Sequence, residues 1–182
     1  MDAFTNWNEI LFDHLKSTLV SFINYPKPYN KIWILRESLI IIEKAEYDEL
    51  GSTKDFCREF ARILDGTGSV TNGVCLVQKF RDIPFTILGR RTNSPLVNPQ
   101  FFSFENKDSN GNALNLGETV LLQEEVNPLL TELREREIIV TALHNHWLFE
   151  QPRAMYMHFE SIEPPLDFAR KIRQAFKVLK TE

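Results

Sequence analysis

From residue 53 onward, short strand-like segments alternate with amphipathic helical segments, and this alternation constrains the fold more than any other feature of the chain. Apolar residues recur every three or four positions in the helical segments, whereas the strand-like runs are short and rich in β-branched and aromatic residues. Hairpins interspersed with helices favour an α+β fold over a doubly wound α/β fold. We therefore expect a mixed or antiparallel sheet built from β-hairpins, with amphipathic helices packed on it. The expected helices span 53–65, 126–136 and 165–179, and the expected strands span 74–80, 85–89, 101–105, 119–123, 138–143 and 153–160.

Two polar segments in this part of the chain have the composition of turns. Asp65-Gly66-Thr67-Gly68 is expected to end the first helix, because glycine accepts the backbone conformation found at helix C-termini. Arg81-Asp82-Ile83-Pro84 is expected to be the turn of a hairpin between strands 74–80 and 85–89.

The first 50 residues are interpreted as an N-terminal helical extension of the α+β domain, which spans residues 51–182. Residues 6–23 have the apolar spacing of an amphipathic helix. Residues 31–44 fit either a helix or two short strands, with a helix preferred.

Charge and hydropathy limit the classes of partner that the chain is expected to bind. The net charge of −4 and the lack of a basic stripe argue against nucleic acid, which is bound through clustered lysine and arginine. Arg90-Arg91 is expected at a solvated hairpin end. The longest apolar run is Leu39–Ile42, whereas a helix that spans a bilayer needs about 20 apolar residues. Residues 1–15 also lack the basic and apolar pattern of a signal peptide. We therefore expect a cytoplasmic protein without a membrane partner.

The two cysteines, Cys57 and Cys75, lie in a helical and a strand pattern, respectively. Both are expected to be small buried thiols, because two isolated cysteines without CxxC spacing are typical of a reducing compartment.

Four segments in the C-terminal half carry a resemblance. They are Gly117–Leu122 with Glu125–Pro128, then Ile139–His146, then Pro152-Arg153, and then Tyr156-Met157-His158. In this order they resemble the LppY/LpqO-type family of bacterial proteins of unknown function, over roughly residues 53–178. The chain departs from the family pattern at Glu118, where aspartate is usual, at Glu163-Pro164-Pro165 before the last helix, and in having no lipobox cysteine near its start. The resemblance implies a fold unit and a candidate site, but no activity.

The same region contains the candidate metal ligands. His144 and His146 are two residues apart, so on an extended strand both imidazoles point to one face. Glu150 follows in the spacing HxHxxxE, and His158 lies on the expected returning strand. If the loop runs from Trp147 to Met155, His158 lies opposite His144, whereas a tight loop moves it to about 10 Å away. Such a set would suit Zn, Fe, Ni or Mn.

Other residues of this hairpin suggest a site for a small molecule. Arg153 could clamp an anionic ligand or form an ion pair with Glu150 or Glu160, and Asn145 and Tyr156 are further candidate ligand-binding residues. The apolar loop Trp147–Phe149 is expected to wall off a pocket at the mouth of the hairpin. There are three alternatives to a metal site. The hairpin could be a binding module for small anionic molecules, or it could be purely structural. The third alternative is an interaction domain in which residues 1–50 bind a partner, or a second copy of the chain in a homo-oligomer. Whether the protein is an enzyme stays open.

Overall fold

The computed structural model describes residues 53–180 of the 182-residue chain. The chain divides into two compact units, Met1–Ala45 and Glu46–Glu182, and the described residues all belong to the second. The expectations for residues 6–23 and 31–44 lie outside the described residues. Between residues 53 and 180, no helix is long and apolar enough to cross a membrane.

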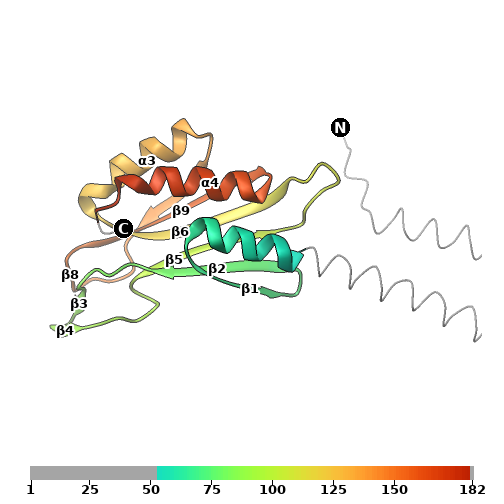
Figure 1. Ribbon diagram of the computed structural model, residues 1–182. Coiled ribbons are helices and arrows are strands. Elements are labelled where there is room, and N and C mark those ends of the chain that lie inside the picture. Colours follow the sequence, from blue (N-terminus) through green and yellow to red (C-terminus); the bar gives the residue numbers. More distant parts are fainter. Residues whose placement is uncertain (1–52, 181–182) are drawn as a thin grey trace, which may run out of the picture. The chain divides into compact units, whose positions relative to one another are not determined.

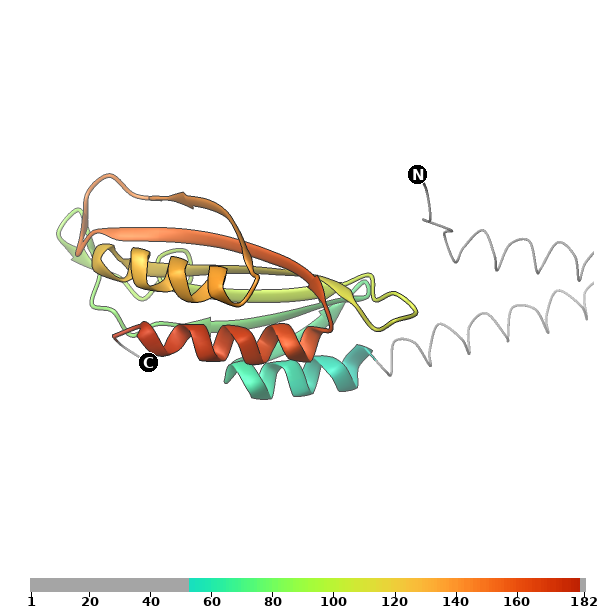
Figure 2. The ribbon, with the colours of Figure 1, turned by 90° about the horizontal axis from the view of Figure 1, so that it is seen from above.

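The described unit is built on a six-stranded antiparallel sheet with three helices on one face, which confirms the expected α+β class (Figures 1 and 2). The helices are residues 53–64, α3 (Val126–Glu135) and α4 (Pro165–Ala175). The strand order is β1-β2-β5-β6-β9-β7, and every neighbouring pair is antiparallel. The strands are β1 (Thr67–Thr71), β2 (Val74–Phe80), β5 (Pro99–Glu105), β6 (Ala113–Leu122), β9 (Ala154–Glu163) and β7 (Ile139–His144).

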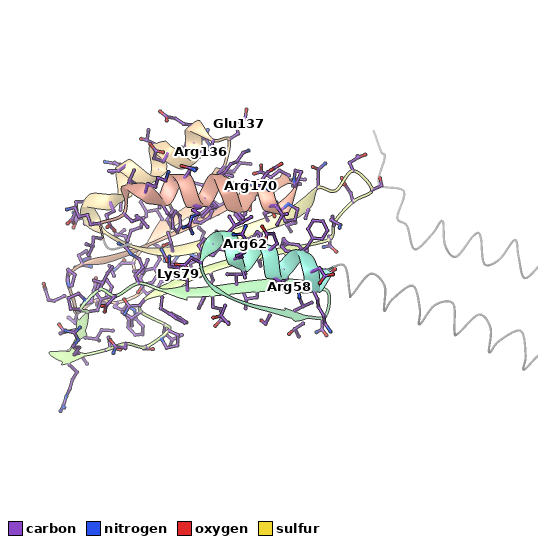
Figure 3. All side chains as sticks on the ribbon, viewed as in Figure 1. Arg58, Arg62, Lys79, Arg136, Glu137 and Arg170 are labelled. Atoms are coloured by element: carbon purple, nitrogen blue, oxygen red, sulfur yellow. A yellow bond between two sulfur atoms is a disulfide. The ribbon has the colours of Figure 1, made fainter. Side chains whose placement is uncertain are left out.

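The main core lies between the sheet and the helices, where one helix face meets alternate residues of each strand. Phe60 of the first helix packs against Phe104 of β5 and Phe168 of α4, with ring centroids 5.2 and 6.2 Å apart. Because strand side chains alternate between faces, the residues between these core positions point to the opposite face of the sheet. That opposite face carries the candidate site. The outward sides of the helices are charged, as Arg58, Arg62 and Arg170 illustrate (Figure 3).

A second, smaller core covers one end of the opposite face. It contains Ile83, Phe85, Val97, Val120, Ala154 and Tyr156. A three-stranded antiparallel sheet lies beside it, in the order β4 (Arg90–Arg91), β3 (Thr86–Ile87) and β8 (Glu150–Gln151).

One of the two turn predictions is wrong, and one strand was missed. The first helix ends at residue 64, where Asp65-Gly66-Thr67-Gly68 was expected to end it. Residues 67–71 form β1, which pairs with β2, whereas the sequence suggested only the end of a helix there. Residues 81–84 are not a hairpin turn, because β2 pairs with β1 and β5 while β3 pairs with β4 and β8. The physical reason is burial: Ile83 and Phe85 are 2% and 0% exposed, so this segment carries the chain into the second core.

The prediction of two free thiols is also wrong. Cys57 and Cys75 form a disulfide with a Cα–Cα distance of 5.5 Å, joining the first helix to β2. Both positions are buried, as expected, but the packing of the helix on β2 brings the two side chains together. Disulfides persist mainly in oxidising compartments, which weighs against the expected cytoplasmic placement.

Candidate metal centre

The three histidines of the hairpin gather on the open face of the sheet. Each of His144, His146 and His158 offers one ring nitrogen, and these three atoms all lie within 4.8 Å of one another. His144 ends β7 and pairs with Tyr156, while His158 pairs with Ala142, after an irregularity between Val140 and Ala142. His158 is therefore two residues away from the position opposite His144. Because two residues are one full period of a strand, it still points to the same face.

The closest two imidazoles approach each other through the same atom. The Nε2 atoms of His144 and His158 are 2.9 Å apart, with ring centroids at 5.0 Å. Two nitrogens bound to one tetrahedral zinc ion at ~2.0–2.1 Å lie roughly 3.3 Å apart. The two rings thus already have nearly the spacing that one shared ion requires. Without an ion, this distance allows one N–H to donate to the lone pair of the other ring.

The third imidazole, that of His146, lies flat against Tyr156. Their ring centroids are 3.5 Å apart and their planes differ by 6°. Tyr156 is itself buried, and its hydroxyl donates a hydrogen bond to the carbonyl of Val97 at 2.8 Å. Burial raises the pKa of Tyr156 to about 12, so the phenol stays neutral near pH 7. The tyrosine therefore provides a rigid, uncharged support that fixes the plane of His146.

The surroundings of His146 favour its neutral form. Burial lowers the pKa of its imidazole, and His144 and His158 lower it further. Two contacts oppose this: the carboxylate of Glu118, and a hydrogen bond with the backbone of Leu96. The net shift of this pKa is downward, and neutral imidazole is the form that binds metals. A ring nitrogen held by a backbone acceptor is also a common arrangement for a metal-binding histidine, because it fixes the tautomer.

Glu118 is a candidate site residue that sequence reasoning missed. It lies on β6 directly across from His158, and its Oε1 atom is 3.9 Å from Nε2 of His146. Its side chain is 24% exposed. The sequence marked this position only as a departure from a family pattern. The pairing of β6 with β9 was needed to place the carboxylate beside the histidines.

Glu150 is not part of the histidine cluster, and its side chain is buried beside Arg153. Glu150 is 3% exposed and is not one of the three residues whose ligand atoms lie within 4.8 Å. Its Oε1 atom accepts a hydrogen bond from the Ala154 backbone at 3.4 Å and pairs with Nε of Arg153 at 3.3 Å. The ion pair considered for Arg153 is therefore present. Asn145 donates from its side chain to the carbonyl of Trp147 at 2.9 Å, which fixes the start of the loop.

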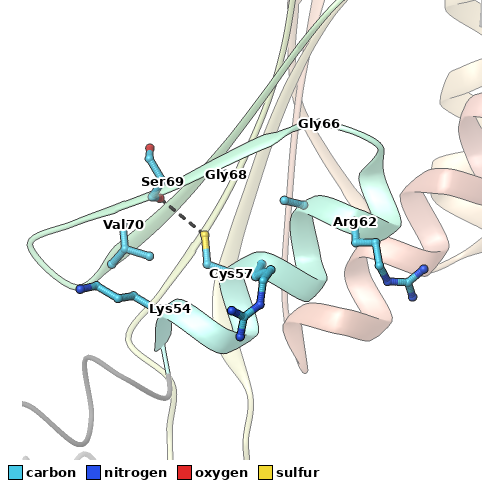
Figure 4. Close-up of a pocket in the computed structure, with 9 residues that line it drawn as sticks. Lys54, Cys57, Arg62, Gly66, Gly68, Ser69 and Val70 are labelled. Atoms are coloured by element: carbon cyan, nitrogen blue, oxygen red, sulfur yellow. Dashed lines mark hydrogen bonds between the residues drawn. The ribbon is translucent and has the colours of Figure 1, made fainter.

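The apolar loop after His146 is only partly packed against the rest of the described unit. Trp147 packs against the second core, but Leu148 and Phe149 are 75% and 69% exposed. A cavity of ≈ 600 Å³ lies elsewhere, beside the disulfide, and its lining includes Lys54 and Arg62 (Figure 4). The 3.5 Å approach of Cys57 Sγ to the carbonyl of Ser69 in that cavity is a contact and not a hydrogen bond, since a disulfide sulfur carries no proton.

Comparison with curated proteins and with solved structures gives no significant match. A family model described as a Domain of Unknown Function (DUF1259) matches residues 58–178, a range that includes Glu118 and all three clustered histidines. Its description does not carry the LppY/LpqO name that the sequence motifs suggested. The match covers well over half of the chain, which therefore belongs to the family described as a Domain of Unknown Function (DUF1259).

Proposed function

We propose that this protein binds one divalent transition-metal ion through His144, His146 and His158. The observation that carries the proposal is the convergence of three ring nitrogens within 4.8 Å, from a strand end, a loop and a returning strand. None of these histidines lies in the core, where packing alone would account for it, because two are exposed and the third is partly exposed. A metal ion and a proton compete for the same ring lone pair, so an ion at this site would bind the neutral imidazoles.

The ligand set favours a particular class of metal. Imidazole nitrogen suits Zn, Fe and Ni, while Mg and Ca prefer sites made of oxygen ligands. Three histidines leave at least one coordination position open, as in zinc sites that bind a water molecule or substrate. We propose that Glu118, in place of Glu150, is the carboxylate beside this centre, because its Oε1 atom lies 3.9 Å from Nε2 of His146, although it is not part of the three-atom cluster itself. A carboxylate ligand would extend the range of metals to Mn.

The metal-free alternative has less support. Arg153 would have to bind the anion, but its guanidinium is already paired with the buried carboxylate of Glu150. Releasing Arg153 would leave Glu150 buried without its counter-charge, which is unfavourable. The interaction module based on residues 1–50 lies outside the described residues.

Metal analysis of protein purified without a histidine tag tests the proposal. We expect about one equivalent of a transition metal per chain after exposure to zinc and removal of excess, and its loss in His144→Ala and His158→Ala. The matched control is His14→Ala, which removes the fourth histidine of the chain and should retain the metal. Glu118→Gln should weaken binding without abolishing it, since the three imidazoles remain.

Thermal unfolding gives an independent measurement. A metal that binds only the folded chain stabilises it by about 2.7 kcal/mol at a free concentration 100 times its Kd. We therefore expect zinc to raise the Tm of the wild type and of His14→Ala, and to leave that of His144→Ala unchanged. Retention of stoichiometric metal by both His144→Ala and His158→Ala would refute the proposal.

A further inference from the structure

The turn between β3 and β4 carries a leucine that neither the backbone nor packing explains. Leu88 and Gly89 connect Ile87 to its partner Arg90 and have φ values of 52° and 74°. A two-residue hairpin turn with both φ values positive favours asparagine followed by glycine, and an L side chain other than Asn or Asp is disfavoured there. Leu88 is also 75% exposed, so it gains little from burial. A residue that disfavours its own turn conformation and is not buried does not stabilise the fold, which suggests that its side chain has a role in binding.

Leu88 lies beside the apolar loop that follows His146. The backbone N–H of Leu88 donates to the carbonyl of Phe149 at 3.4 Å, which joins the hairpin to the loop after His146. Leu148 and Phe149 are 75% and 69% exposed. We call Leu88, Leu148 and Phe149 the apolar tip. In Figure 1 the strands β3, β4 and β8 lie at the lower left, on the other side of the six-stranded sheet from α3 and α4.

Positive charge lies directly behind the apolar tip. Arg90 and Arg91 form β4, and both are exposed. Neighbouring residues of a strand point to opposite faces, so the two guanidinium groups flank the hairpin on both sides. Segments 85–93 and 147–153 together contain three arginines and one acidic residue, Glu150, which is buried and paired with Arg153. These two segments therefore carry a net positive charge in a chain whose net charge is −4.

We propose that the apolar tip docks on the surface of a lipid bilayer that contains anionic phospholipids. In this arrangement Leu88, Leu148 and Phe149 enter the interface, and Arg90 and Arg91 contact the phosphate groups. An apolar end followed by a cationic ring matches the order of layers at such a surface, from acyl chains to charged headgroups. The proposal replaces the expectation that the chain has no membrane partner, and it does not depend on the metal site.

The size and form of the apolar tip favour a bilayer over a protein partner. Stable protein interfaces bury at least about 1,200 Å² and need a complementary surface. Three side chains around a projecting two-residue turn offer a much smaller contact. A bilayer interface has no fixed shape to match, and it accommodates a few apolar side chains together with attracted cations.

Co-flotation of the full chain with lipid vesicles tests this proposal. We expect the wild type to float with vesicles containing phosphatidylcholine and 30% phosphatidylglycerol, and at least five-fold less with phosphatidylcholine alone. Raising the salt concentration should release the bound fraction, because the arginine contribution is screened. Leu88→Asn combined with Phe149→Ser should reduce the floated fraction at least five-fold, and Arg90→Gln with Arg91→Gln should remove the preference for anionic vesicles.

The variants separate docking from folding. Leu88→Asn places the favoured residue in the turn, so its Tm should equal or exceed that of the wild type. The matched control is Ile162→Asn, which removes a 78% exposed apolar side chain near the opposite end of β9. This control should float like the wild type. Flotation that survives Leu88→Asn with Phe149→Ser overturns the proposal, and so does the absence of flotation. Self-association that these two substitutions abolish, without flotation, would assign the apolar tip to a second copy instead.

Discussion

Arg81 and Glu125 form an ion pair that is almost completely removed from solvent. The guanidinium donates to both carboxylate oxygens, at 2.6 and 2.8 Å, and also to the carbonyl of Val120 at 3.0 Å. The carboxylate also accepts from the backbone N–H groups of Leu122 and Lys180, each at 2.8 Å. Burial alone would raise the pKa of Glu125, but these donors outweigh it and hold the pKa below its ordinary value. The pair therefore connects the end of β2, the start of α3 and the C-terminal end of the described chain.

Glu125→Gln should lower the free energy of unfolding by about 3–5 kcal/mol at pH 7, because the variant breaks a buried ion pair in which the carboxylate accepts two hydrogen bonds from Arg81. The folded-state pKa of Glu125 is depressed, so its contribution is fully present above the unfolded carboxyl pKa of about 4.3 and is lost as the pH falls through the lower folded value. Urea unfolding at pH 7 and at pH 3 should therefore show a smaller loss of stability on acidification in the variant than in the wild type. Glu124→Gln is the control, since Glu124 is exposed. Equal losses in all three proteins would contradict this role.

The spacing of single residues predicts part of the candidate site but not all of it. His144 and His146 are two residues apart, which predicts a shared face, and the structure has both in the cluster. His158 and Glu118 could not be placed from the sequence, because their positions depend on strand register. Glu150 is close to His146 along the chain, yet its side chain is buried beside Arg153. Sequence proximity is a poor guide where a loop changes direction between two residues.

Among the elements, the long helices were predictable and the short strands were not. The apolar spacing of α3 and α4 repeats over several turns, so their ranges were found almost completely. β1 contains Thr67-Gly68-Ser69-Val70-Thr71, whose glycine and small polar residues have the composition of a turn. It is a strand because each of its residues pairs with β2, from Thr67 with Gln78 to Thr71 with Val74. Such tertiary pairing overrides weak local preference.

The contact between β6 and β9 at Gly117 gives a test at the level of strand packing. Gly117 pairs with Phe159, and a Cβ atom added at Gly117 would lie 2.1 Å from Cε2 of that ring. Gly117→Ala should therefore lower the free energy of unfolding by about 1–3 kcal/mol, because the ring must move within a packed core. Phe159→Leu supplies the room, so in the double variant the cost of Gly117→Ala should be much smaller. Chemical unfolding of the four proteins measures this coupling, and additive effects would show that the ring does not oppose the added methyl group.

In the molecule as a whole, the disulfide and the candidate metal centre constrain different parts of the described unit. The disulfide joins the first helix to β2, whereas the histidines come from β7, the following loop and β9 at the other side of the sheet. The sheet order places β5 and β6 between β2 and β9. Breaking the disulfide should therefore change stability without changing the local geometry of the histidines.

Cys57→Ala with Cys75→Ala should lower the free energy of unfolding by about 3 kcal/mol, the size expected for a crosslink that closes a loop of this length, since the cysteines are 18 residues apart. Reduction with dithiothreitol should lower the Tm of the wild type toward that of the double variant and leave the variant itself unchanged. The zinc affinity of the folded double variant should equal that of the oxidised wild type, because strands β5 and β6 separate the two sites. Alkylation of the native protein followed by mass measurement checks the premise: two free thiols in protein purified under oxidising conditions would contradict it. A loss of zinc affinity in the double variant at temperatures where it is folded would instead show that the two sides of the sheet are coupled.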